Sequence, residues 1–299
     1  MRPRPAHVSA AAGAGEPVTL ICPVCRQALA LNGRTYGCPA GHAFDRAREG
    51  YVNLLLRRPG SSVGDSREML AARRAFLGGG HYRPLSDAIN ERVQSQLAHR
   101  TAATVLDVGC GEGYYLCRLR ATLGPARSQS GAILIGVDVA REAVRLAARA
   151  CPEATFAVAD VWSLVPVADG SVDVLLSVFS PRNRAEFERV LAPDGLLLVV
   201  VPEPEHLQEL RSLPGFLGVP EDKRDALVQQ LTGGFRLVDE RVISLRLGLV
   251  GDDLVHLAAM TPSARHLSPA TLEGLRASAM TPVTAAFRLL GFAKVGPRR

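Results

Sequence analysis

The sequence predicts an α/β protein in which a doubly wound parallel sheet is preceded by a small N-terminal metal-binding domain. Three observations support this fold class. Short runs rich in leucine and β-branched residues alternate with helical segments from residue 104 onward. A loop with three glycines follows the first of these runs, at the end of the sheet where such folds bind ligands. Three cysteines and a histidine lie close together before residue 43, at the spacing of metal ligands.

Length and composition set the broad class of protein. The chain has 299 residues, of which 47% are hydrophobic and 21% charged, and this length accommodates one large domain and a smaller one. The longest apolar run, residues 195–201, is too short to span a membrane. The first fifteen residues lack the apolar core of a secretory signal. We therefore expect a cytoplasmic protein with no membrane partner, in which residues 1–19 are disordered.

The metal-binding motif comes first along the chain. Cys22 and Cys25 are separated by two residues, and Cys38 and His42 form a second pair twelve residues further on. Three thiolates and one imidazole are the ligand set of a closed structural zinc site, whereas a catalytic zinc keeps one position open. Residues 20–58 are too few to build a core of their own, and a metal is the usual remedy. We predict a structural zinc ion in this domain.

A helical linker and the large domain follow. Turn-forming residues occupy 59–64, and helices are expected from residue 65 or 66 to 77 and from 84 to 98, within a linker of residues 59–100. The domain of residues 101–299 should contain strands at 104–108, 133–139, 155–158, 172–179 and 196–201. Because these strands are continuously apolar, a parallel sheet covered on both faces is expected. Two longer extended stretches, 235–249 and 282–292, should pair at one edge of the sheet.

The glycine-rich loop favours a cofactor that contains adenosine. Gly109, Gly111 and Gly113 allow the backbone to turn sharply and to approach a ligand. The dinucleotide fingerprint has its third glycine one residue later, so the loop favours S-adenosylmethionine, which has no phosphate. Asp138, at the end of the second strand, is expected to accept hydrogen bonds from the ribose hydroxyls. Asp160, at the end of the third strand, is expected to meet the adenine amino group.

Basic residues are concentrated in the first third of the chain. Residues 1–100 carry 14 arginines and 7 acidic residues (+7), whereas residues 101–299 carry 21 basic and 22 acidic residues (−1). This asymmetry favours a polyanionic partner at this end, although a solvated basic surface gives the same pattern. The arginines expected to contact phosphates follow the zinc motif or lie in the linker: Arg46, Arg48, Arg57, Arg58, Arg73 and Arg74.

The residues around these motifs resemble the 23S ribosomal RNA guanine-N1-methyltransferases. The zinc motif and residues 42–55, residues 64–85 and the loop 107–115 carry the resemblance, which covers residues 20–210 and, more loosely, the tail. The zinc motif joined to this loop is specific to the family, whereas the loop alone is not. Residues 159–162 and 178–183 are most similar to the actinobacterial branch, which is associated with resistance to the macrolides tylosin and mycinamicin.

The resemblance implies a Rossmann-like methyltransferase sheet and S-adenosylmethionine-dependent methylation of guanine N1. The substrate it implies is a hairpin loop of 23S rRNA that lines the peptide exit tunnel, and it also implies a homodimer. It implies that Cys22, Cys25, Cys38 and His42 are the zinc ligands. It also implies that Gly111, Glu112, Tyr82 and His206 contact the cofactor, in addition to Gly109 and Asp138.

No catalytic base is identified from the sequence. Guanine N1 must lose a proton, but Asp107 and Asp138 are expected to hold the loop and the ribose. The backbone carbonyls of residues 177–181, after the fourth strand, are the expected acceptors near the substrate base. Cys110, inside the glycine loop, is expected to be a buried structural thiol rather than a nucleophile.

Two other functions fit parts of the sequence. One is a small-molecule methyltransferase in which the zinc motif is an ornament, and the basic first third argues against it. The other is a non-catalytic zinc-ribbon protein that binds RNA, and the intact glycine loop with Asp138 argues against it. Binding of S-adenosylmethionine separates the second from both methyltransferases, and methylation of rRNA separates the two methyltransferases from each other.

Overall fold

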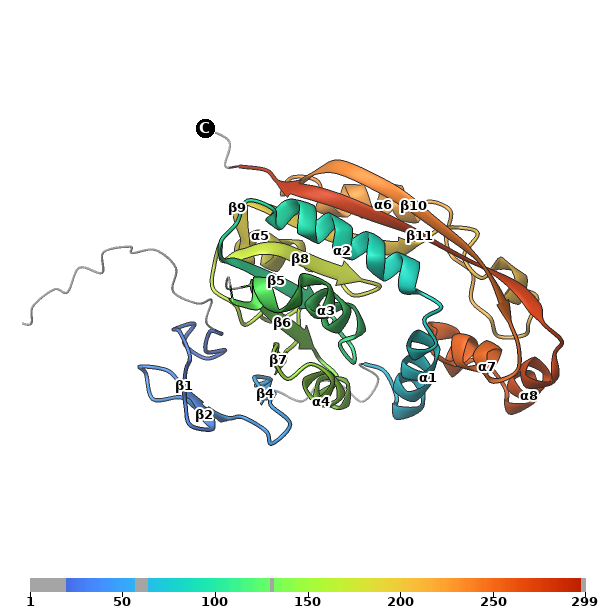
Figure 1. Ribbon diagram of the computed structural model, residues 1–299, viewed down its shortest axis with the longest axis horizontal. Coiled ribbons are helices and arrows are strands. Elements are labelled where there is room, and N and C mark those ends of the chain that lie inside the picture. Colours follow the sequence, from blue (N-terminus) through green and yellow to red (C-terminus); the bar gives the residue numbers. More distant parts are fainter. Residues whose placement is uncertain (1–19, 57–63, 130–131, 297–299) are drawn as a thin grey trace, which may run out of the picture.

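The computed structural model describes residues 20–56, 64–129 and 132–296. The expected disorder of residues 1–19, most of the expected joint at 59–64, and both Arg57 and Arg58 lie outside these ranges. The described residues form a large mixed sheet with helices on both faces and a small antiparallel sheet at one end (Figure 1). The predicted fold class is confirmed.

The large sheet has the strand order β10-β11-β9-β8-β5-β6-β7-β4. β4 to β9 pair in parallel, and β11 pairs antiparallel with both β9 and β10. The five predicted strands of the parallel part are present, although β9 begins five residues before the expected start at residue 196. The strands are β4 (Val52–Asn53), β5 (Ala103–Val108), β6 (Ala132–Asp138), β7 (Thr155–Val158), β8 (Val172–Val178), β9 (Leu191–Pro202), β10 (Phe235–Leu249) and β11 (Thr281–Lys294).

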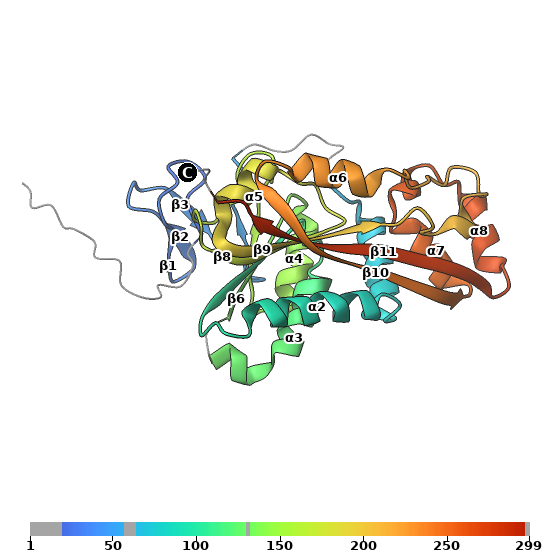
Figure 2. The same cartoon turned by 90° about the horizontal axis from the view of Figure 1, so that it is seen from above.

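Helices cover both faces of this sheet, as continuously apolar strands require. α2 (Arg83–Leu97), α3 (Tyr114–Gln129) and α4 (Arg141–Ala150) lie on one face, and α5 (Arg184–Val190) and α6 (Lys223–Leu231) lie on the other (Figure 2). Two clusters of buried apolar side chains, one on each side of the sheet, form the core. Helix starts follow local chemistry, since Ser66 and Asn183 each accept a hydrogen bond from a backbone N–H of the first turn.

The two extended stretches of the tail pair along their whole length at one edge of the sheet, as expected. The chain between them forms α7 (Asp252–Ala259), the 3₁₀ helix η2 (Pro262–Arg265) and α8 (Pro269–Ala277). α7 packs against α1 (Arg67–Gly78), the first linker helix. α7 and α8 lie at the end of the molecule opposite the zinc-binding segment (Figures 1 and 2).

The zinc-binding segment is joined to the large sheet rather than separated from it. Its small sheet consists of β1 (Ala30–Asn32), β2 (Thr35–Gly37) and β3 (Ala43–Asp45). β4, only seven residues after β3, is the edge strand of the large sheet and pairs with β7. Leu20, Leu29 and Leu54 are buried in the same apolar cluster as strands β6 and β7. The segment therefore completes its core by packing on its neighbour.

The strand order also fixes where a ligand binds. β5 lies between β6 and β8, so the chain reverses its direction of winding at this strand. In doubly wound sheets the crevice beyond the carboxyl end of that strand holds the ligand. The glycine loop, residues 109–113, lies at this position. None of the described helices is long and apolar enough to cross a membrane.

Candidate functional site

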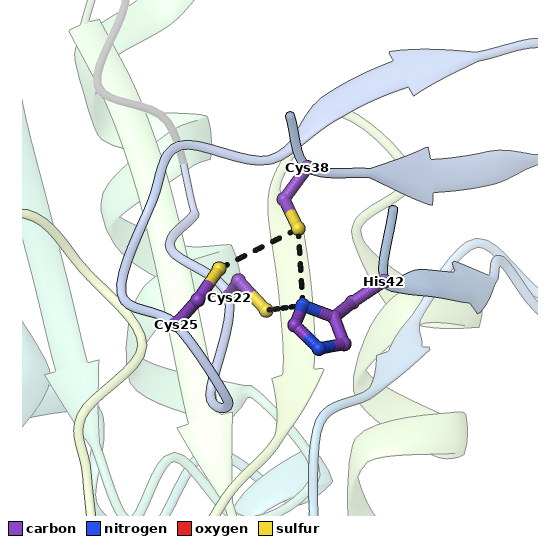
Figure 3. Close-up of side chains that lie close together, drawn as sticks. All are labelled: Cys22, Cys25, Cys38 and His42. Carbon is purple, nitrogen blue, oxygen red and sulfur yellow. Dashed lines mark hydrogen bonds between the residues drawn. The ribbon is translucent and has the colours of Figure 1, made fainter. Parts of the chain in front are cut away.

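The four predicted metal ligands lie together (Figure 3). The Nδ1 atom of His42 is 3.3 Å from the Sγ atom of Cys38 and 3.6 Å from that of Cys22, and the Sγ atoms of Cys25 and Cys38 are 3.5 Å apart. All four donor atoms lie within 4.8 Å of one another. A tetrahedron with zinc–ligand bonds of about 2.0–2.3 Å has edges of about 3.3–3.8 Å, so the donor set fits a zinc ion.

This donor set defines the kind of zinc site. Four protein ligands fill a tetrahedral zinc and leave no position for water or substrate, so the site is structural. Cys22 is fully buried and belongs to the apolar cluster shared with the large sheet. The metal thus fixes the chain at the point where the segment contacts the rest of the molecule.

The second site is a cavity of about 650 Å³ beyond the carboxyl ends of β5, β6 and β8. This volume is ample for a nucleoside-sized ligand together with part of a substrate. The predicted cofactor contacts all line it: Tyr82, Gly109, Gly111, Glu112, Asp138 and His206. Asp160 and residues 178–181 line it as well. The structure therefore brings the predicted residues together, and their individual roles remain predictions.

Gly109 and Gly111 need to be glycine for different structural reasons. Gly109 has a φ of +74°, and a Cβ atom there would lie 2.4 Å from the Cβ atom of Ser180. Gly111 has a φ of +55°, but an added Cβ would meet only the Arg73 guanidinium, at 3.4 Å. Gly109 is therefore required by packing against the segment after β8. Gly111 gives the backbone its left-handed conformation beside the cavity.

Asp138 anchors the loop. Its Oδ2 atom accepts a hydrogen bond from the Gly111 N–H (2.9 Å), and its Oδ1 atom accepts one from the Ala140 N–H (2.8 Å). The sequence assigned this task to Asp107, so that expectation was wrong. Because each carboxylate oxygen accepts more than one hydrogen bond, Asp138 still has acceptor capacity for a ribose hydroxyl.

Several buried polar groups at the cavity have no hydrogen-bond partner among the described residues. They include both carboxyl oxygens of Asp107 and of Glu112, the hydroxyl of Tyr82 and the Nδ1 atom of His206. Buried polar groups are nearly always paired in folded proteins, so an unpaired set around one cavity indicates a polar ligand. The carboxyl groups suit the cationic sulfonium and ammonium groups of S-adenosylmethionine. The residues present thus fit this cofactor.

The cavity shifts the pKa of the groups that line it. Burial, followed by the charges of the nearby Asp138 and Glu112, raises the pKa of Asp107 to about 7. Burial also raises the pKa of Glu112, which the Arg73 guanidinium, 3.6 Å away, partly opposes. His206 has a pKa lowered to about 4, first by burial and then by the charges of Lys223 and Arg211. The imidazole is therefore neutral at pH 7.

Two arginines that were expected to contact RNA phosphates make contacts within the protein. Arg73, expected to contact RNA phosphates, lines the cavity and pairs with Asp65 at 2.6 Å. Arg46 donates a hydrogen bond to the Gly50 carbonyl. Burial raises the pKa of Cys110 well above its ordinary value, in agreement with a structural thiol.

Other walls of the cavity were not predicted at all. They come from α1, from the segment between α7 and η2, and from β11, through residues such as Met69, Met260 and Phe287. No local motif marks these residues. They reach the cavity because α7 packs on α1 and because β11 pairs with β9, next to the parallel strands.

Comparison with known families fits this arrangement of a zinc cluster and an adenosine-type cavity. Residues 20–56 match the family model of a zinc ribbon described as "RlmA, N-terminal", and residues 105–195 match one described as "Methyltransferase domain". Fold and sites thus define an S-adenosylmethionine-dependent methyltransferase that carries a structural zinc ribbon.

Curated relatives narrow this class. The chain is 42% identical over 288 residues to a putative 23S rRNA (guanine-N(1)-)-methyltransferase of Micromonospora griseorubida, covering 90% of this chain and 95% of the relative. It is 41% identical over 250 residues to the 23S rRNA (guanine(748)-N(1))-methyltransferase of Streptomyces fradiae, covering 84% and 87%. A Bacillus subtilis relative with a similar name is 36% identical, covering 81% and 86%. The chain belongs to the family of 23S rRNA (guanine-N1)-methyltransferases.

Proposed function

We propose that this protein methylates N1 of a guanine in a hairpin loop of 23S rRNA, at the position corresponding to guanine 748. The observation that carries the proposal is the 41% identity to the Streptomyces fradiae relative, whose name states that position, over 87% of its length. A modification at this place in the exit tunnel would confer resistance to tylosin-type macrolides. The proposal has the protein working in the cytoplasm, where ribosomes are assembled.

The cavity residues then have complementary tasks. The cofactor supplies an electrophilic methyl group on a sulfonium, so the protein mainly aligns it with the guanine and excludes water. We propose that the backbone of Gly109 and Gly111 contacts the cofactor and that Asp138 binds its ribose. Glu112, Tyr82 and His206 would complete the cofactor site with the polar atoms that have no partner within the described chain.

The guanine is proposed to enter beside the segment after β8. An unstacked base in an RNA loop reaches such a pocket at lower cost than a base in a duplex. The segment ends in Ser180 and Pro181 on the cavity wall, and its backbone carbonyls would accept the guanine N–H groups. No residue is assigned as the base that removes the N1 proton.

At larger scale, we propose that residues 20–58 form the zinc ribbon, 59–100 the linker and 101–299 the catalytic domain.

The family resemblance also supports a homodimer. The edge strand β10 offers a surface for a second copy, because Val238 and Val242 are exposed on it. Light scattering of the purified protein measures the oligomeric state directly.

Methylation of isolated 23S rRNA tests the function. Labelled S-adenosylmethionine should transfer one methyl group per rRNA, and reverse transcription should stop at the guanine corresponding to position 748. A parallel reaction with a metabolite extract should give no labelled small molecule. Labelled metabolites without labelled rRNA would overturn the proposal in favour of the small-molecule methyltransferase. Expression in a sensitive host should raise the tylosin concentration that inhibits growth.

A further inference from the structure

The cavity has both acidic and basic side chains in its wall. Asp107, Glu112 and Asp138 form its acidic side at and beside the glycine loop, and Arg182 and Lys223 form its basic side, on the segment after β8 and at the start of α6. The acidic side suits the cationic cofactor. Arg182 and Lys223 are not among the cofactor contacts named above, so they need a different explanation.

Arg182 and Lys223 differ from the basic residues next to them in sequence. Arg184, Arg189 and Arg224 each hold a carboxylate within 3.5 Å. Among the described residues, Arg182 donates hydrogen bonds only to neutral oxygens, the Ser180 carbonyl (3.2 Å) and the Gln230 side chain (3.4 Å). Lys223 has neither a hydrogen bond nor an ion pair within the described ranges. Both cations therefore line the cavity without an ion pair to any carboxylate of the described residues.

The two cations are also close enough to affect each other. Both side chains are half-buried. Burial lowers the pKa of Arg182, and burial followed by the charge of Arg182 lowers the pKa of Lys223. Partly desolvated like charges repel each other, and an anion between them would remove this cost. Arginine binds phosphate through its planar fork of donors, and lysine binds it as a point charge.

Aromatic side chains flank this position. Phe179, 45% exposed, has a φ of +55°, which is strained for a residue other than glycine. Trp162 is 61% exposed, and both rings line the cavity. Large exposed rings beside unpaired cations are the features that bind single-stranded nucleic acid, since the rings stack on bases and the cations hold phosphates.

We propose that Arg182 and Lys223 form a phosphate site that holds the RNA backbone next to the target guanine. The site rests on the proposed function, because it assigns the basic side of the same cavity to the RNA. It lies in the catalytic cavity and is separate from any phosphate contacts of the zinc ribbon. Its task is to keep the unstacked nucleotide in register with the cofactor.

The double variant Arg182→Ala with Lys223→Ala tests the site. Each lost charged contact should weaken binding of a 23S rRNA hairpin about tenfold. The slope of log affinity against log salt should flatten by about one unit per contact. Affinity for S-adenosylmethionine, measured by calorimetry, should stay unchanged. Arg236→Ala is the matched control, because Arg236 is exposed on β10 away from the cavity.

A second measurement separates this site from the proposed function. Wild type should bind guanosine 3′,5′-bisphosphate more tightly than guanosine, and the double variant should not distinguish them. Equal discrimination in wild type and variant would overturn the phosphate site, as would a loss of S-adenosylmethionine affinity with RNA binding unchanged. If wild type fails to methylate 23S rRNA, the proposed function is wrong, and the bisphosphate comparison still decides the phosphate site.

Discussion

At the scale of single residues, the cavity combines burial with polar groups that the protein itself does not pair. Asp107 is 1% exposed, and neither of its carboxyl oxygens has a hydrogen-bond partner within the described ranges. Such a group destabilises the protein when it is ionised, unless a bound cation compensates for the burial. The residues that bind the cofactor therefore lower the stability of the free protein.

The pH dependence of stability should show this cost. The pKa of Asp107 is about 7 in the folded protein and ordinarily 3.8. Between these values the folded state keeps a proton that the unfolded state has released, so stability falls as the pH rises from about 4 to about 7. Asp107→Asn should stabilise the cofactor-free protein at pH 8 by up to about 4 kcal/mol and weaken S-adenosylmethionine binding. Urea unfolding at pH 4 and pH 8 measures the difference. Equal stability of the variant and wild type at pH 8 would contradict the shift.

Gly109 and Gly111 of the loop should respond differently to an added side chain. Gly111→Val places its side chain beside the cavity and should abolish S-adenosylmethionine binding while the sheet stays folded. Gly109→Ala drives a Cβ atom against Ser180 and should lower the melting temperature as well. Calorimetry and thermal denaturation on both variants give the comparison. Wild-type cofactor affinity in Gly111→Val would show that the loop serves another purpose.

At the scale of elements, sequence patterns predicted the zinc segment and the parallel strands well. The ligand spacing predicted the zinc cluster, and apolar runs predicted the strands of the parallel sheet. The packing partners could not be predicted, because β4 joins β7 and α1 joins α7 through contacts between residues far apart in the chain. Arg73 is an example, because its charge favoured a contact with RNA phosphates whereas in the fold it lies beside Asp65 and Glu112.

Loss of the metal should act on the zinc segment and on the sheet edge it covers. Cys25→Ser should lose stoichiometric zinc and lower the melting temperature. It should also increase hydrogen exchange in β4 and β7, because Leu20 and Cys22 share their core. Affinity for S-adenosylmethionine should change little, since the cofactor cavity contains none of the four ligands. Full zinc content in Cys25→Ser, measured by atomic absorption, would rule out the ligand assignment.

At the scale of the whole molecule, the exposed arginines of the zinc segment lie at the end opposite α7 and α8. Arg26, Arg34 and Arg48 are exposed on the zinc segment, at the end opposite α7 and α8 (Figure 1). We expect these arginines to contact RNA phosphates outside the cavity. The charge asymmetry can be counted in the sequence, whereas the fold shows which of these arginines are exposed.

Reversal of two of these charges should weaken RNA binding and leave the cofactor site intact. Arg34→Glu with Arg48→Glu should flatten the salt dependence of rRNA affinity by about one unit per lost contact. S-adenosylmethionine affinity should equal that of wild type. Filter binding between low and high salt gives the slope. An unchanged slope would mean that these arginines only solvate the surface.

The position of β11 has a consequence for how the protein is made. β11 lies between β9 and β10, although it follows both in the chain. A nascent chain that has passed residue 249 but not residue 294 exposes the open edges of β9 and β10, which are templates for aggregation. The enzyme therefore cannot assemble its sheet strand by strand during synthesis. A chain held on a ribosome arrested before residue 281 should be sensitive to protease. A chain released after residue 296 has been made should be resistant.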